Sequence, residues 1–309
     1  MSFTQAEGQQ RAVRLLSGLM ETGRLPSALL FVGPDGVGKT LVAHDFAKAL
    51  LCLSGKPGSP CGLCADCQGI DKRLHPDVKA VNQAYQTALN EGDVSKAKTL
   101  KVDTIRHLRY DMEMQSMLGR WKVAVIEEAD TLEPEAANSL LKIIEEPPAQ
   151  TLWILTTSQR ERLPKTIPSR CFSIGFSPLP PGVVARALQR SGVASERAVR
   201  LAELCEGSVS RALQLSQSPG YPESLTDTPL SPWTAADALP REAYLARVQV
   251  ESALFALAQD LRLRHLDGRL PFSRVERPLR EINALRRSLK ANADPRTVLT
   301  LAALDAQGI

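Results

Sequence analysis

Short apolar runs alternate with helix-like spacings of apolar residues in the first part of the chain. Residues 4–22 have apolar positions at helical spacing, and Gly23 ends that pattern. Residues 28–32 form a continuous apolar run, which is typical of a buried strand. Residues 41–50 return to helical spacing, so a strand, a glycine-rich loop and a helix are predicted in succession.

The same kind of pattern predicts further strands and helices downstream. Within residues 122–130, four apolar residues end in paired acids, as expected of a buried parallel strand. Residues 134–146 carry a proline in the first turn and a proline pair just after the end, which is typical of a helix. The other predicted elements are a strand that begins near residue 75, a strand over 151–155, a short strand that ends at 176, and a helix over 102–118. Strands that alternate with helices indicate an α/β fold with a parallel sheet.

The pattern changes at residues 179–182, where Leu-Pro-Pro-Gly marks a boundary. Residues 183–215 are helical in pattern, turn-forming residues continue to Pro240, and helical patterning resumes at Arg241. A chain of 309 residues, 43% of them hydrophobic, is long enough for two or three domains with cores of their own. We predict domains over residues 1–177, 178–216 and 217–309.

Charge and composition exclude few classes of protein. The formal net charge of +4 permits contact with nucleic acid without demanding it. No signal peptide opens the chain, and no apolar run approaches the roughly 18–20 residues of a membrane span. We therefore expect a cytoplasmic protein without a membrane partner. In that compartment the six cysteines point to a metal site or buried thiols before disulfides.

The glycine-rich loop has the GxxxxGK[ST] pattern of a phosphate-binding loop. Its fixed positions are Gly33, Gly38, Lys39 and Thr40, and Gly36 lies between them. Glycines let backbone amides surround an anion, and the N-terminus of the next helix adds a favourable dipole. The pattern predicts that Lys39 reaches the β- and γ-phosphates and that Thr40 ligates Mg²⁺. A chance glycine turn is the alternative, and the flanking strand and helix argue against it.

A cluster of cysteines follows the predicted helix within residues 52–67. Its members are Cys52, Cys61, Cys64 and Cys67. Four thiolates at this spacing suit a tetrahedral Zn²⁺ site, in which no position stays open for catalysis, so the predicted role is structural. An iron–sulfur cluster and a loose thiol pair are the alternatives. We expect His75 and His107 to be structural or solvated residues, since sulfur already satisfies the metal.

Paired acids end the apolar run within residues 122–130. The carboxyl edge of a parallel sheet is where ligands bind in α/β folds. In a P-loop enzyme the first acid orients Mg²⁺ and the second polarises the attacking water, which predicts these roles for Glu127 and Glu128. Glu127 is one methylene longer than the usual Asp, and Mg²⁺ tolerates little departure from octahedral geometry. A solvated acidic turn is the alternative.

In this order the motifs resemble those of AAA+ ATPases, and more narrowly of clamp-loader subunits of the bacterial DNA polymerase III holoenzyme. The residues that carry the resemblance are 33–40, the cysteine cluster, 123–130, 136–142, 145–148 and 169–171. The resemblance covers residues 5–215 well. It implies an AAA+ nucleotide-binding domain over 1–177, a small helical lid domain over 178–216 and an all-α collar domain over 217–309.

The resemblance also implies roles for two residues outside the phosphate loop. Arg170, within Ser-Arg-Cys, matches the arginine finger, which acts in trans on ATP bound by a neighbouring subunit. Thr157 matches the sensor-1 position at the tip of a strand. An ordinary surface arginine is the alternative for Arg170. The implied partners are the other clamp-loader subunits in a hetero-pentameric ring, the sliding clamp and primed DNA.

Within this family the chain resembles delta-prime subunits more than the gamma/tau motor subunits. The motor subunits place a sensor-2 arginine three residues after the glycine of the lid, where this chain has Ser210 followed by Arg211. One step on a helix is about 100°, so Arg211 is expected to face elsewhere. Together with Glu127 and the short length, this favours a subunit that binds ATP or ADP with Mg²⁺ but hydrolyses little by itself. A gamma-type motor ATPase is the alternative, and an AAA+ protein with unrelated cargo is a third.

Overall fold

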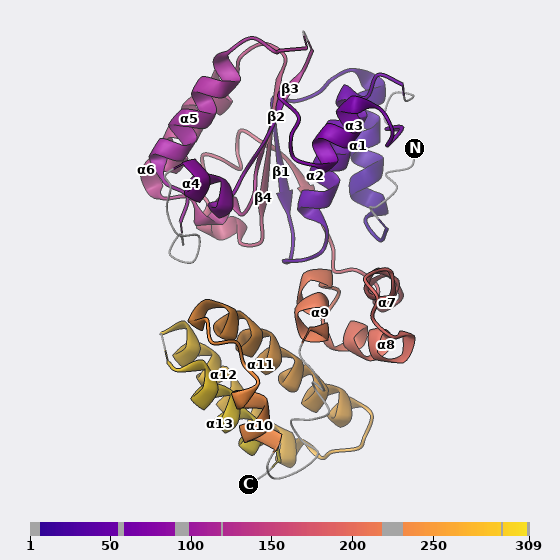
Figure 1. Cartoon of the computed structure of the whole chain (residues 1–309), viewed down its shortest axis with the longest axis vertical. Helices are drawn as coiled ribbons and strands as arrows, with labels where there is room; N and C mark the ends of the chain where they lie inside the picture. Colours follow the sequence, from indigo (N-terminus) through magenta and orange to yellow (C-terminus); the bar gives the residue numbers. More distant parts are fainter. Residues whose placement is uncertain are drawn as a thin grey trace. The chain divides into compact units, whose positions relative to one another are not determined.

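The computed structural model describes residues 7–54, 59–89, 99–118, 120–217, 231–291 and 293–307. The chain divides into two units, Met1–Pro178 and Leu179–Ile309 (Figure 1). The first unit is an α/β domain and the second is all-helical, as the pattern predicted. The finer division into 1–177, 178–216 and 217–309 stays a prediction.

A five-stranded parallel sheet forms the centre of the first unit. Its strands are β1 (Ala28–Val32), β2 (Val78–Val81), β3 (Lys122–Ile126), β4 (Thr151–Thr157) and β5 (Phe172–Gly175), in the order β2-β3-β4-β1-β5. Because all neighbours run parallel, the carboxyl ends of the strands lie along one edge of the sheet. The loops that follow β1, β3 and β4 therefore come together.

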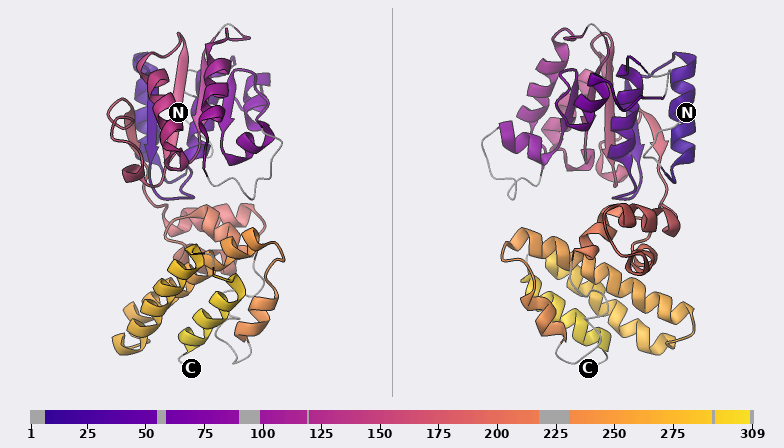
Figure 2. Two further views of the ribbon diagram at one scale, coloured as in Figure 1. Left: turned by 90° about the vertical axis from the view of Figure 1, so that its left-hand side faces the viewer. Right: turned by 45° about the vertical axis from the view of Figure 1, so that its right-hand side comes forward.

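Helices cover both faces of this sheet (Figures 1 and 2). They are α1 (Gln10–Thr22), α2 (Lys39–Leu51), α3 (Ala65–Asp71), α4 (Gln83–Leu89), α5 (Val102–Glu113) and α6 (Pro134–Glu145). On one face, Leu108 of α5 and Leu140 of α6 join a buried cluster with Trp153 of β4. On the other, α2 contacts β3 and β4 and buries Val42 and Phe46 completely. The central strands β1, β3 and β4 are buried along nearly their whole length because both faces of the sheet are covered there.

The helix predicted over residues 102–118 is shorter than expected. It ends at Glu113, because the carboxylate of Asp77 binds the chain that follows. Asp77 accepts hydrogen bonds from the backbone N–H groups of Met117, at 2.9 Å, and Leu118, at 3.1 Å. A polar side chain before β2 thus competes with the helical hydrogen bonds and turns the chain toward β3.

One strand end agrees with prediction and another differs. The strand predicted within residues 122–130 ends at Ile126, directly before the paired acids as expected, and Glu128 then has a left-handed backbone with φ of 52° before a short 3₁₀ helix (Ala129–Thr131). The strand predicted over 151–155 continues to Thr157, which pairs with Val32 of β1. Residues 1–6, where the first helix was predicted to begin, lie outside the described part of the chain, and α1 begins at Gln10.

The second unit consists of helices connected by turns. They are α7 (Pro181–Arg190), α8 (Ser195–Leu204), α9 (Val209–Ser216), α10 (Ser231–Asp237), α11 (Ala243–Leu266), α12 (Phe272–Lys290) and α13 (Pro295–Gln307). In the described ranges of both units, none of the helices combines the length and the apolar character that crossing a membrane requires.

The side chain of Arg211, in α9, packs against α11 in this unit. Its guanidinium carbon lies 3.8 Å from the centre of the Phe255 ring, and that of Arg286 from α12 lies 5.8 Å from the same ring. Both distances are within the range of cation–π attraction. Beside them, the Ser252 hydroxyl donates a hydrogen bond of 2.7 Å to the side-chain oxygen of Gln214. Arg211 therefore packs against another helix of its own unit.

Candidate functional site

The phosphate-binding pattern lies where the sequence places it, between β1 and the N-terminus of α2. Gly36 and Gly38 have φ angles of 74° and 95°, which L side chains rarely adopt, and Gly38 caps α2. Gly33 is needed for a different reason: a Cβ added there would come within 2.4 Å of the Phe176 backbone oxygen. The loop therefore has the glycine backbone of the phosphate-binding pattern and leads directly into a helix N-terminus, which favours anions.

Gly33→Ala is expected to destabilise the first unit, because the new methyl group must displace the backbone at Phe176. Overpacking of this kind costs about 1–3 kcal/mol. Gly18→Ala is the matched control, since a Cβ at Gly18 in helix α1 meets no atom within 4 Å. That change should stabilise slightly, because alanine favours helices. Denaturant unfolding of both variants tests the pair, and equal stabilities would contradict the predicted close approach.

Lys39 is the first residue of α2 and is bound to its own loop. Its ammonium group donates hydrogen bonds of 2.7 Å to the backbone oxygens of both Gly33 and Pro34, and lies 3.7 Å from a carboxylate oxygen of Asp35. Burial lowers the pKa of Lys39, and nearby acids offset part of that effect. Thr40 is half-buried in the same turn of α2. An anion in the loop would give the Lys39 charge a stronger partner than backbone carbonyls.

Glu128 and Asp130 are the acids that face Lys39 from the loop after β3. Burial raises the pKa of Glu128, with the charges of Asp35 and Asp130 acting in the same direction and Lys39 opposing them. Asp130 accepts hydrogen bonds from the Thr157 hydroxyl, at 2.7 Å, and from the backbone N–H of Ser158, at 3.2 Å. The structure thus brings Glu128, Thr157 and the phosphate loop to one edge. Asp130 was not singled out from the sequence, although its position just after the paired acids was a signal.

Glu127 lies in a different environment. Its carboxylate accepts a hydrogen bond of 3.1 Å from the Asn82 amide, and lies 3.5 Å from the Arg73 guanidinium and 3.8 Å from the His44 ring. Burial raises the pKa of Glu127, but the nearby His44 ring, the hydrogen bond from Asn82 and the charge of Arg73 outweigh that effect and lower it overall. The predicted Mg²⁺ role of Glu127 stays a prediction, and its neighbours here come from α2 and from residues flanking β2.

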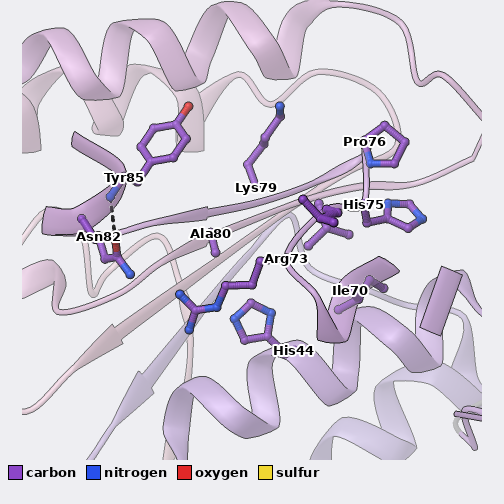
Figure 3. A pocket seen from close by; sticks show the side chains of 12 residues that line it. His44, Ile70, Arg73, His75, Pro76, Lys79, Ala80, Asn82 and Tyr85 are labelled. Carbon is purple, nitrogen blue, oxygen red and sulfur yellow. Dashed lines mark hydrogen bonds between the residues drawn. The ribbon is translucent and has the colours of Figure 1, made fainter. Parts of the chain in front are cut away.

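His44, Arg73 and Asn82 also line a pocket of about 390 Å³ beside the edge strand β2 (Figure 3). In Figure 3, Arg73 and His44 lie next to each other, while Tyr85 and Lys79 extend toward the opposite side. β3 and β4 separate β2 from β1, which the phosphate loop follows. The pocket therefore lies beside β2 and not beside the phosphate loop, and three of its lining residues contact Glu127.

The four predicted metal ligands are brought together by the ends of two helices. Cys52 caps the C-terminus of α2, Cys64 caps the N-terminus of α3, and Cys67 lies within α3. All four sulfur atoms, including that of Cys61, lie within 4.8 Å of one another, and those of Cys52 and Cys64 are 3.8 Å apart. Zn–S bonds of about 2.3 Å in a tetrahedron separate sulfurs by about 3.8 Å, so the cluster fits one metal ion.

The charge state of these thiols suits a metal as well. Backbone N–H groups of Leu63 and Cys64 point at the sulfur of Cys61 and lower its pKa to about 6. Burial instead raises the pKa of Cys67 above its usual range. One thiolate is thus available near neutral pH, and a cation would supply the charge that ionises the buried thiol. None of the six cysteines, all of which lie in the described ranges, forms a disulfide.

Polar contacts connect the cysteine module, residues 52–67, to the segments that precede β2 and β3. Asp66, between two ligands, lies 3.3 Å from Nε2 of His75 and accepts a hydrogen bond of 3.1 Å from Arg120. Nδ1 of His75 accepts a hydrogen bond of 3.1 Å from the backbone N–H of Asp77. Nε2 therefore carries the hydrogen atom of the neutral ring and donates a hydrogen bond to Asp66. His107 is half-exposed, 3.9 Å from Asp111. Neither histidine belongs to the sulfur cluster.

Arg170 lies in the loop that precedes β5. β5 pairs in parallel with β1, so the amino end of β5 and the carboxyl end of β1 are at opposite edges of the sheet. The phosphate loop follows β1, and Arg170 is consequently at the edge away from this chain's own Lys39. Its side chain is 41% exposed and forms an ion pair of 2.6 Å with Glu145 at the end of α6.

The phosphate-loop pattern and the parallel sheet define a P-loop domain with the AAA+ fold. A solved structure described as a DNA polymerase III gamma subunit-related protein from Thermotoga maritima has the same fold, with a TM-score of 0.60 at 13% identity. The match covers 96% of this chain and 99% of that one. The family described as "DNA polymerase III, delta subunit" matches residues 8–180, which is more than half of the chain. This chain belongs to that family.

The curated relatives that the chain matches are subunits of DNA polymerase III. It is 34% identical over 218 residues to DNA polymerase III subunit delta' of Bacillus subtilis. This match covers 71% of this chain and 62% of the relative. It is 33% identical over 221 residues to DNA polymerase III subunit tau of Escherichia coli. This match covers 70% of this chain and 32% of the relative. The matched region spans less than two thirds of either relative.

Proposed function

We propose that this chain is a delta-prime-type subunit of the DNA polymerase III clamp loader. It would join other clamp-loader subunits in a hetero-pentameric ring that loads the sliding clamp on primed DNA during replication. Its own part would be to supply Arg170 in trans to ATP on a neighbouring subunit. Membership of the DNA polymerase III delta family and the similarity to the delta' subunit of Bacillus subtilis support this assignment.

The position of Arg170 is the observation that carries the proposal. An arginine finger stabilises charge that develops on the transferred phosphoryl group, so it must reach the nucleotide directly. Arg170 and the phosphate loop occupy opposite edges of one parallel sheet, and an exposed arginine there is available to another subunit. Hydrolysis at the neighbouring site would then depend on assembly.

The phosphate loop supports binding of ATP or ADP with Mg²⁺ to this chain. The loop amides and Lys39 would hold the phosphates, and Thr40 is the hydroxyl that reaches the metal ion. Glu128 and Thr157 face the same edge and would orient a water and the γ-phosphate. Glu127 is bound by Asn82 and lies beside Arg73, which favours weak hydrolysis by this chain.

Zn²⁺ is the metal we propose for the cysteine cluster. Four sulfur ligands within 4.8 Å of one another match a closed structural zinc site and leave no position for a substrate. The site would link the end of α2, which begins at the phosphate loop, to α3 and the contacts of Asp66.

A gamma-type motor ATPase is the second candidate function. It is favoured by the retained Lys39 and by Glu128, whose raised pKa suits a general base better than an ordinary surface acid does. Similarity to the tau subunit of Escherichia coli is nearly equal to that with delta'. Steady-state ATP hydrolysis by the purified chain, alone and with its partners, separates the two. Robust turnover alone that Glu128→Gln abolishes would establish the motor.

Lys39→Ala is expected to weaken ATP binding by the isolated chain by about 10- to 100-fold. The basis is the loss of one charge-assisted hydrogen bond to phosphate, which contributes about 1.5–3 kcal/mol. Titration with a fluorescent ATP analogue measures the change. Lys101→Ala is the control, since Lys101 is an exposed lysine at the start of α5. Unchanged affinity in the Lys39 variant would rule out the predicted nucleotide site.

A further inference from the structure

Arg170 is held by a carboxylate of its own chain. Its Nε atom lies 2.6 Å from Oε1 of Glu145, and its Nη1 donates to the backbone oxygen of Thr166 at 3.3 Å and to the Ser169 hydroxyl at 3.4 Å. Within the described part of the chain, Nη2 makes no such contact. A guanidinium has five N–H donors in a rigid plane, so fixing Nε and Nη1 sets the direction in which the Nη2 donors point.

The location of Glu145 argues that the pair has a role beyond stability. Glu145 is the last residue of α6, where the negative end of the helix dipole disfavours a carboxylate. The two side chains are 41% and 46% exposed, and exposed ion pairs contribute little to folding. Both groups are therefore open to a neighbouring molecule. What the contact does specify is the direction of the arginine.

We propose that Glu145 is a positioning residue for the arginine finger. It binds the Nε side of Arg170, keeps the side chain extended from the loop before β5, and leaves Nη2 for the γ-phosphate of the neighbouring subunit. This inference rests on the proposed trans role of Arg170. Catalytic groups misplaced by about 1 Å lose up to about 100-fold in rate, so loss of the tether should lower turnover without removing the charge.

The test is ATP hydrolysis by the reconstituted clamp loader that contains the full chain. Glu145→Ala is expected to lower kcat by about 10-fold with little change in KM, because the arginine acts in the transition state. Glu145→Gln keeps an acceptor oxygen for Nε and should lose less. Glu146→Ala is the matched control: Glu146 is the next residue, and its backbone N–H simply ends α6 on the Lys142 oxygen.

The double variant Arg170→Ala/Glu145→Ala should be no slower than Arg170→Ala alone, since a tether has no effect without its arginine. Full activity of Glu145→Ala, or activity above that of the wild type, would overturn the inference, the latter by making Glu145 a competitor of the phosphate. If Arg170→Ala itself left hydrolysis unchanged, the proposed finger role would fail instead. A kcat loss with unchanged thermal unfolding of the chain excludes a merely structural effect.

Discussion

Arg170→Ala is expected to reduce hydrolysis at the neighbouring ATP site by about 10³-fold or more, the range measured for arginine fingers. The nucleotide affinity of this chain should stay unchanged, since Arg170 and its own phosphate loop lie at opposite edges of the sheet. Single-turnover hydrolysis by the assembled complex measures the first quantity. ATP-analogue titration of the isolated chain measures the second.

Arg162→Ala is the control for this experiment, because Arg162 is an exposed arginine of the preceding 3₁₀ helix (Arg160–Arg162). Arg170→Lys adds information, since lysine keeps the charge but loses the planar fork that binds a phosphoryl group. A trans role predicts a large loss with both Arg170 variants and none with the control. A fall in the isolated chain's own nucleotide affinity would instead place Arg170 at its own site.

Local patterns were sufficient to predict the fold and the parts of the site that are continuous in sequence. The phosphate loop needs a strand before it, glycines within it and a helix after it, and all three lie inside residues 28–51. The cysteine cluster is equally local, because two helix ends and a short loop bring its sulfurs together. Such features follow from spacing along the chain alone.

Contacts between distant segments were outside the reach of that reasoning. Asp130 binds the Thr157 hydroxyl only because β3 and β4 are neighbours in the sheet, and no spacing rule encodes that pairing. The same holds for Glu127 and Asn82, which follow adjacent strands β3 and β2. The early end of α5 likewise depends on Asp77, a residue far away in sequence.

Removal of the metal is the second large effect that we expect. Structural zinc contributes about 10–16 kcal/mol of binding free energy in small zinc domains at neutral pH, and that energy is coupled to folding. Without it, the four thiols lose their common ligand, and α3 is a helix of only seven residues. Isolated helices of that length are unstable in water. Chelation should therefore unfold residues 59–71 locally.

The sheet should survive that loss, because its core is buried independently of the cysteines and Arg120 still binds the backbone oxygen of Leu51. The expected results are one zinc per chain by elemental analysis, and faster hydrogen exchange in α3 after chelation or in Cys64→Ser. Nucleotide binding should be nearly unchanged. Cys171→Ala is the control, since Cys171 is a cysteine outside the cluster whose pKa is raised by burial. Visible absorption by the purified protein would indicate an iron–sulfur cluster instead. Unchanged hydrogen exchange in α3 after chelation would contradict the prediction and mean that the contacts of Asp66 are sufficient to hold this module in place.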